Sequence, residues 1–445
     1  MHTWYEQAVF YHIYPLGLLG AEKTNTLTET AHRLRDLEAW IPHIRALNGS
    51  AIYIGPLFES STHGYDTRDF RLVDRRLGTN EDFAHFVQLC HENGIRVVVD
   101  GVFNHTGREF FAFQDIREKR EASPYKDWYR GVNFGWGSPL GDPFGYEAWQ
   151  GHFELPCLNL WNPDVRQYLF DSIRFWVDNF DIDGIRLDCA NVLDFGFMKE
   201  LREKTSAMKP DFWLMGEVIH GEYSRWVNPE MLHSVTNYEL HKALYSGHND
   251  HNYFEIAHNV RRLEAVGKSL YTFVDNHDED RIASKLNHPA NLFPVYQLLF
   301  TLPGIPSIYY GSEWGIEGKR SRTSDEVLRP ALCLSDMDEK APELVSHIAA
   351  LGKIHAENDA FHTGSYKELL LTNRQYAFSR SGEHGTLISA VNNDEQPASI
   401  SIPLPCAASD AVSLLPGEIP FSLENGRLSV TLPANGGAIF KLQEV

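Results

Sequence analysis

Four short apolar runs in the sequence are each followed at once by a carboxylate. An apolar run predicts a buried strand, and a charge at the end of such a strand is costly to bury unless it has a partner or a function. In an eight-stranded α/β barrel, the carboxyl ends of the strands line the active site. We therefore expect three carboxylates, two histidines and an arginine to share one neighbourhood, contributed by residues 100–105, 184–188, 216–217 and 276–278.

Short apolar runs alternate with helical stretches from residue 8 to about residue 355, which is the pattern of β/α units and a parallel sheet. The expected fold class is α/β, a (β/α)8 TIM barrel. Helices are predicted over residues 30–47 and 80–93, where apolar residues recur at helical spacing. Eight strands are predicted, near residues 9–14, 51–54, 95–100, 184–188, 212–217, 234–236, 271–275 and 307–310.

One connection in this predicted barrel is far too long for a turn. Residues 106–158 follow the third strand and are rich in glycine, proline and aromatic residues, and a stretch of that length is usually functional or a small inserted domain. From about residue 364 apolar and polar residues alternate, which predicts antiparallel strands. The expected domains are a barrel over 1–105 and 159–360, an inserted loop-rich domain over 106–158, and a C-terminal antiparallel β domain over 361–445.

Composition excludes several classes of partner. The 445 residues include 40 Lys and Arg against 60 Asp and Glu, and a net charge of −20 disfavours nucleic acid and anionic membranes. No stretch approaches the roughly 18 apolar residues of a transmembrane helix, and the N-terminus lacks the pattern of a secretory signal.

Five cysteines without a C-x-x-C pair indicate free packing thiols in a reducing compartment, so we expect a cytoplasmic protein. They are Cys90, Cys157, Cys189, Cys333 and Cys406.

Asp188 and Glu217, at the ends of the fourth and fifth predicted strands, form a candidate catalytic pair. Hydrolysis of a glycosidic bond with retention needs a carboxylate nucleophile and a proton-donating carboxyl group about 5 Å away. Arg186 lies two residues before Asp188, so both side chains point to one face of the strand and the guanidinium can hold that carboxylate ionised. Glu217 must hold a proton when substrate arrives, which requires burial or a neighbouring negative charge such as Asp278 or Asp188.

His105 and His277 are candidate donors to sugar hydroxyls, and Tyr65 is a candidate platform for a sugar ring. Each residue taken alone has an ordinary alternative: a buried histidine can be structural, an aspartate can cap a helix, and Arg186 with Asp188 can be a buried ion pair. Chance does not readily place all of these residues at the ends of strands three, four, five and seven. The functional interpretation is therefore favoured for the set.

The sequence resembles the α-amylase family of retaining glycoside hydrolases over nearly the whole chain. The resemblance is carried by the four segments above and by residues 9–15, 55–60, 63–66, 155–159 and 302–311. The resemblance implies that Asp188 is the nucleophile, Glu217 the acid/base and Asp278 the stabiliser of the transition state. It further implies that the insertion is the family's second domain and the tail its β-sandwich third domain. Tyr65, His105, Arg186 and His277 then match the positions that hold the glucosyl unit just before the cleaved bond.

Residues 217–220 and 232–238 look most like the cyclomaltodextrinase, neopullulanase and maltogenic amylase group. Family members that cleave α-1,4 bonds are more similar to this chain than members that cleave α-1,6 bonds at two places: Cys189 with Ala190, and residues 155–159. Asp325 and Arg329 either reach the non-reducing sugar or form a surface ion pair. The expected function is hydrolysis of α-1,4-linked maltooligosaccharides, with cyclodextrins and pullulan as further candidate substrates.

Two alternatives stay open at this point. The same residues can transfer the glycosyl unit to another sugar, as glucanotransferases, trehalose synthases and sucrose phosphorylases of this family do. A relative of another class would be a non-catalytic carbohydrate-binding or transporter-associated protein, although the carboxylates are intact and no anchor is seen. The sequence leaves the oligomeric state open.

No cofactor or metal is expected to be required. In the family, calcium is held by an asparagine matched by Asn104, by acidic oxygens of the insertion and by a backbone carbonyl at the position of Val192. Here Val192 replaces a histidine and Asn191 a lysine. A second calcium loop of the cyclomaltodextrinase-like group corresponds to residues 15–25, which offer few of the hard oxygens that calcium prefers.

Overall fold

The computed structural model describes residues 3–337 and 339–445. The chain forms two compact units, one from Met1–His12, Pro42–Ala51 and Thr236–Val445, the other from Ile13–Ile41 and Ile52–Val235. No helix in the described part of the chain is long and apolar enough to cross a membrane.

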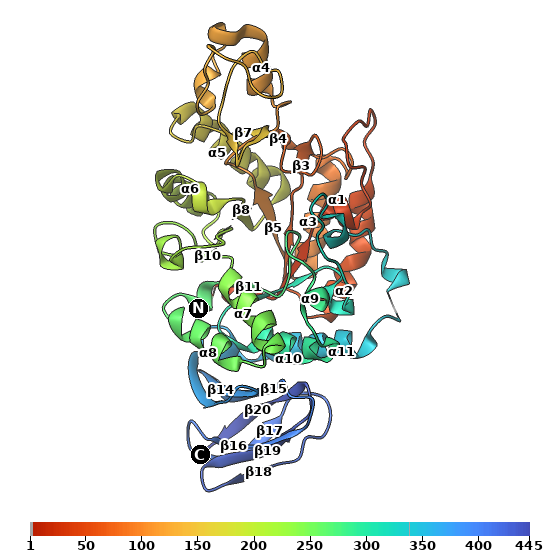
Figure 1. Cartoon of the computed structure of the whole chain (residues 1–445), viewed down its shortest axis with the longest axis vertical. Helices are drawn as coiled ribbons and strands as arrows, with labels where there is room; N and C mark the ends of the chain where they lie inside the picture. The colour runs from red at the N-terminus through yellow and green to blue at the C-terminus, as the bar shows by residue number, and fades with distance from the viewer. Residues whose placement is uncertain (1–2, 338) are drawn as a thin grey trace. The chain divides into compact units, whose positions relative to one another are not determined.

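Eight parallel strands form one nearly closed sheet in the order β10-β9-β8-β5-β2-β1-β12-β11, which confirms the predicted (β/α)8 barrel. Figure 1 labels β5, β8, β10 and β11 of this sheet. The buried side chains of the eight strands are mostly apolar because both faces of the sheet are covered. Each predicted barrel strand overlaps an observed one. The strands are β1 (Phe10–Ile13), β2 (Ala51–Ile54), β5 (Arg96–Gly101), β8 (Gly184–Leu187), β9 (Trp213–Gly216), β10 (Ser234–Val235), β11 (Tyr271–Phe273) and β12 (Ile305–Tyr309).

The predicted helix over 80–93 is confirmed as α3 (Asn80–Glu92), whose N-cap Thr79 accepts a hydrogen bond from the Asp82 main-chain nitrogen. The single helix predicted over 30–47 is wrong. A 3-10 helix over Arg33–Ala39 precedes α2 (Trp40–Ala46), because Pro42 has no N–H to donate and an α-helix accepts it only in its first turn. The other helices before the C-terminal strands are α1 (Pro15–Leu18), α5 (Pro163–Phe180), α6 (Phe195–Met208), α7 (Tyr238–Asn249), α8 (Tyr253–Arg262), α9 (Ile282–Lys285), α10 (Leu292–Thr301) and α11 (Pro342–Glu357).

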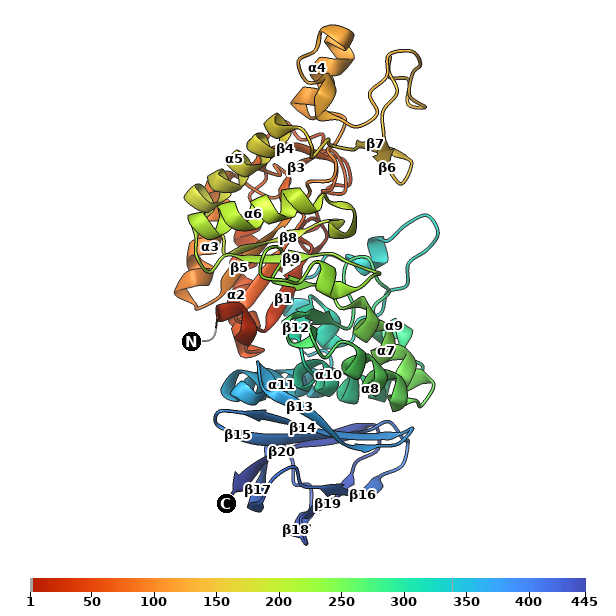
Figure 2. The same cartoon turned by 90° about the vertical axis from the view of Figure 1, so that its left-hand side faces the viewer.

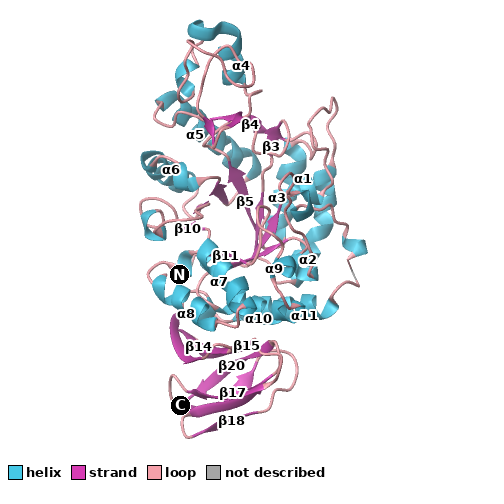
Figure 3. Cartoon of the chain, viewed as in Figure 1, coloured by secondary structure: helices cyan, strands magenta, loops and turns pink. Residues whose placement is uncertain are grey.

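The segment after β5 is mostly loop, as predicted, with one α-helix, two 3-10 turns and a short hairpin (Figure 3). Its aromatic core includes Phe113, Phe144 and Tyr146. The buried carboxylate of Asp142 binds Arg108 and Arg117. The elements are α4 (Phe111–Lys119), β6 (Ala148–Trp149) and β7 (His152–Pro156), and a second hairpin, β3 (Phe58–Ser60) with β4 (Thr67–Val73), precedes them.

The C-terminal strands form two antiparallel sheets, as predicted, in the orders β13-β14-β15-β20-β17 and β16-β19-β18 (Figure 2). Ile388, Ile402, Leu428 and Phe440 belong to the apolar core of this part. The domain boundaries at 105, 158 and 360 stay predictions. The strands are β13 (Ser365–Leu371), β14 (Gln375–Gly382), β15 (Gly385–Asn392), β16 (Ala398–Pro403), β17 (Ala408–Ser413), β18 (Phe421–Glu424), β19 (Arg427–Leu432) and β20 (Gly436–Glu444).

Gln297 on α10 links the barrel helices to the C-terminal strands. Its side-chain nitrogen lies 3.0 Å from the Ser389 hydroxyl and 3.1 Å from the carbonyl oxygens of Ala390 and Ala438. The side chain is fully buried. A buried amide of this kind fixes the position of a helix on a sheet, because no water replaces the bonds if it moves.

Replacing Gln297 by alanine should lower the free energy of unfolding by about 1–3 kcal/mol, because buried acceptors lose their donor. Urea denaturation measures this change. The matched control is Gln88→Ala on the exposed face of α3, where the side chain bonds only Glu92; its effect should stay within about 0.5 kcal/mol. Equal effects of the two substitutions would contradict a linking role for Gln297.

Candidate active site

Three neighbouring strands bring the first group of predicted residues to one edge of the sheet. The parallel register pairs Asp100 on β5 with Arg186 on β8, and Leu187 on β8 with Gly216 on β9. Asp188 and Glu217 directly follow those last two positions. The sequence prediction that these side chains share one neighbourhood is therefore met for Arg186, Asp188 and Glu217.

Arg186 is the centre of this group. Its guanidinium lies 3.0 Å from Asp100 Oδ1, 2.9 Å from Asp188 Oδ1 and 2.9 Å from Glu217 Oε2. Burial lowers the pKa of Arg186, but the charges of Asp100 and Glu217 outweigh that effect and raise its pKa well above the usual value. Arg186 therefore stays charged and holds three carboxylates from three strands.

Asp188 and Glu217 bring carboxylate oxygens close to each other. An oxygen of each carboxylate and the Sγ of Cys189 all lie within 4.8 Å of one another, close to the ~5–5.5 Å of retaining sites and below the ~6.5–9.5 Å of inverting ones. Glu217 is buried, which opposes its charged form. Two donors have the opposite effect and stabilise the ionised Glu217: the Arg186 guanidinium, and the main-chain N–H of Cys189, 3.0 Å from Oε2. The sequence argument did not include these donors.

His105 is a buried neutral histidine with a proton available on one nitrogen. Its Nδ1 accepts a hydrogen bond from the Asn104 side chain at 3.1 Å, which leaves the proton on Nε2. Burial lowers the pKa of His105 to about 3, although the Tyr65 main chain opposes the shift. Within the described residues, Nε2 makes no hydrogen bond of ordinary geometry, so it can donate to a ligand hydroxyl.

Tyr65 lies on the loop between β3 and β4, where its ring is half-buried and tilted against His63 at 6.0 Å. This loop also carries Asp66, which is buried and accepts a hydrogen bond from the Thr62 hydroxyl at 2.7 Å. A half-exposed ring on an anchored loop is suited to contact with one face of a sugar.

The second group of predicted residues follows β11 in the other compact unit. His277 Nε2 lies 3.0 Å from Asp278 Oδ2. The Arg329 guanidinium lies 2.8 Å from Asp278 Oδ1 and 2.7 Å from Asp325 Oδ2. The ion-pair alternative for Asp325 and Arg329 is therefore present, although Arg329 is mostly buried and also anchors Asp278. Contact of either residue with a sugar stays a prediction.

The prediction that the cysteines are packing residues is wrong for Cys333, and buried Cys189 also makes polar contacts. Cys333 is exposed. The Sγ of Cys189 lies 3.1 Å from Asp188 Oδ2 and its main chain bonds Glu217. Sequence reasoning also omitted Asp100 as a site residue, although its place at a strand end was the available signal.

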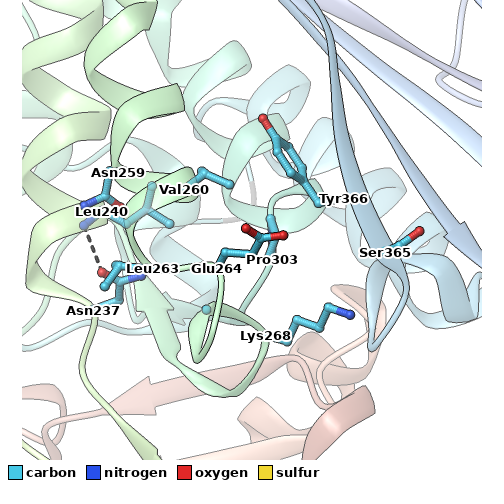
Figure 4. A pocket seen from close by; sticks show the side chains of 11 residues that line it. Asn237, Leu240, Asn259, Val260, Leu263, Glu264, Lys268, Pro303, Ser365 and Tyr366 are labelled. Carbon is cyan, nitrogen blue, oxygen red and sulfur yellow. Dashed lines mark hydrogen bonds between the residues drawn. The ribbon is translucent and has the colours of Figure 1, made fainter. Parts of the chain in front are cut away.

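Two cavities are lined by residues other than the predicted site residues. One of about 240 Å³ is formed mainly by α7, α8 and the start of β13, with Leu240, Val260 and Tyr366 among its apolar lining (Figure 4). Another, of about 510 Å³, lies between the loop that carries His63 and the insertion.

Comparison with known proteins decides the family. The profile described as "Alpha amylase, catalytic domain" matches residues 33–342. A cyclomaltodextrinase of Geobacillus thermopakistaniensis (strain MAS1) is 30% identical over 470 residues, which cover 99% of this chain and 78% of the relative. The chain belongs to the α-amylase family.

Two solved structures are similar in fold to this protein over nearly its whole length. The cyclic α-maltosyl-(1→6)-maltose hydrolase of Arthrobacter globiformis superposes with a TM-score of 0.83 at 26% identity, over 98% of both chains. The debranching enzyme of Nostoc punctiforme superposes with a TM-score of 0.85 at 28% identity, over 99% of this chain and 100% of that one.

Asn104 and one acidic side chain of the insertion, two of the groups considered for the calcium site that the family resemblance implies, make contacts within the protein. The amide nitrogen of Asn104 donates to His105 and its main-chain carbonyl accepts from Leu158. The buried carboxylate of the insertion, Asp142, already binds two arginines, Arg108 and Arg117. Two guanidinium groups beside a carboxylate repel a further cation.

Replacing Arg186 by lysine should lower kcat/KM on maltotriose by at least about 100-fold. One ammonium group cannot hold three carboxylates in position, and a displacement of about 1 Å can lower the rate by about that factor. Initial rates measure the loss. Arg76→Lys is the matched control, because Arg76 is also buried and ion-paired, with Asp74, but has no predicted role in catalysis. Both variants should lose stability, and a similar loss of kcat/KM in both would contradict a direct role for Arg186.

Proposed function

We propose that the protein is a retaining hydrolase of α-1,4-glucosidic bonds in maltooligosaccharides and maltodextrins. The observation that supports this most strongly is the approach of Asp188 and Glu217 oxygens to within 4.8 Å, in a chain of the α-amylase family. Cyclodextrins and pullulan are further candidate substrates. The five free cysteines favour a cytoplasmic location.

The proposed reaction has two displacements. A carboxylate oxygen of Asp188 attacks the anomeric carbon while Glu217 gives its proton to the glycosidic oxygen, so the C–O bond breaks and a glycosyl ester forms on Asp188. Water then gives a proton to Glu217 and attacks the same carbon, and Asp188 leaves. Two inversions restore the α configuration.

The names of the relatives support an α-glucan oligosaccharide as the substrate. A cyclomaltodextrinase and a cyclic α-maltosyl-(1→6)-maltose hydrolase both act on cyclic glucans by name. The debranching enzyme makes α-1,6 cleavage the specific alternative. Chromatography of products from maltotriose, panose and pullulan tests these assignments: glucose plus maltose from maltotriose supports hydrolysis, while longer oligosaccharides would indicate glycosyl transfer.

Replacing Glu217 by glutamine should lower turnover of maltotriose by at least about 10³-fold, within the range typical of general acid catalysis. The loss should be much smaller in the glycosylation step of activated aryl glucosides, whose leaving group needs no proton. Pre-steady-state kinetics of both substrates measures the difference. Equal losses would show that Glu217 is not the proton donor.

Retention predicts that the first product released from maltooligosaccharides is the α-anomer, and that a slow fluorosugar leaves an adduct on Asp188. Proton NMR of the fresh product and peptide mass spectrometry measure these outcomes. A β-anomer released first would refute the double displacement.

We also infer that catalysis does not need calcium. Dialysis against a strong chelator should change the melting temperature and kcat little, because an ion that the native state does not bind cannot stabilise it. Thermal denaturation and initial rates before and after dialysis measure this. A large loss reversed by added calcium would contradict the inference.

A further inference from the structure

Cys189 has an unusual backbone conformation at the centre of the proposed site. Its φ of 50° and ψ of 38° lie in the left-handed region, which residues other than glycine, asparagine and aspartate rarely adopt. Backbone strain of this kind is found at functional sites when the surrounding structure enforces it. The residue directly follows Asp188, the proposed nucleophile.

This conformation lets one residue contact both proposed catalytic carboxylates. The main-chain N–H of Cys189 donates to Glu217 Oε2 at 3.0 Å, and its Sγ lies 3.1 Å from Asp188 Oδ2. The other oxygen of Asp188 lies 2.9 Å from Arg186. Each oxygen of Asp188 is therefore held by a different side chain.

The thiol is in the state needed to donate. Cys189 is buried, and burial together with the charges of Asp188 and Glu217 raises the pKa of its thiol well above the usual value. It therefore stays protonated at neutral pH. A protonated thiol beside an ionised carboxylate can only donate in that contact, and its S–H reaches Oδ2.

We propose that Cys189 is a positioning residue: its thiol fixes the plane of the Asp188 carboxylate for attack, and its main chain fixes Glu217 for proton transfer. This proposal rests on the proposed function. It differs from a packing role, because it depends on a hydrogen-bond donor at the side chain and not only on the volume that the side chain fills.

Serine and alanine separate the two roles, because both are small and only serine keeps a donor. Cys189→Ala should lower kcat/KM on maltotriose about tenfold, which is the size expected for a lost hydrogen bond to a charged group. The loss should lie in kcat, and KM should change less than about twofold. Cys189→Ser should recover most of the loss. Cys90→Ala, which removes a buried thiol on α3 away from the site, is the control for general effects of losing a thiol.

Crystal structures of the wild type, Cys189→Ala and Cys189→Ser provide a readout independent of activity. The proposal expects the Asp188 carboxylate to rotate in the alanine variant and to keep its plane in the serine variant. Unchanged kcat/KM in Cys189→Ala, equal losses in the alanine and serine variants, or an unmoved Asp188 would each overturn it. Failure of the proposed function would look different, because the wild type itself would then release no sugar from maltooligosaccharides.

Discussion

One guanidinium between three buried carboxylates is the interaction on which the proposed site depends. Asp100, Asp188 and Glu217 come from three adjacent strands, and each accepts from Arg186 within 3.0 Å. Without that cation, three negative charges in a buried site would repel one another and each would lose its ion-pair partner. The planar fork of an arginine can reach several acceptors at once, so this residue fixes both the charge and the geometry of the strand ends.

The sequence was sufficient for the barrel because its strands are buried on both faces and therefore read as short apolar runs. It was also sufficient to group Arg186, Asp188 and Glu217, since the carboxyl ends of parallel strands meet at one edge. The helix over 30–47 was mispredicted because periodicity outweighed Pro42, whose missing N–H limits where the α-helix can begin.

Other features depend on conformation, which the residue order does not reveal. The left-handed backbone of Cys189 turns a residue that looks like packing into a contact with two carboxylates. The ion pair between Asp325 and Arg329 likewise depends on conformation, because residues four apart in an irregular segment meet only if the chain bends suitably. The arginine was found to bind Asp278 as well.

The carboxylates around Arg186 outnumber the positive charge that holds them. One positive charge cannot neutralise three carboxylates, so the cluster carries an excess of negative charge when all are ionised. Asp100 and Asp188 each have a further donor, Tyr53 at 2.9 Å and Cys189 at 3.1 Å. A proton on any one of these carboxylates would relieve the repulsion among all three. In the proposed mechanism, Glu217 gives up its proton when the glycosidic bond breaks, and the ester that forms on Asp188 removes one negative charge in the same step. The total charge of the cluster would therefore stay constant through glycosylation.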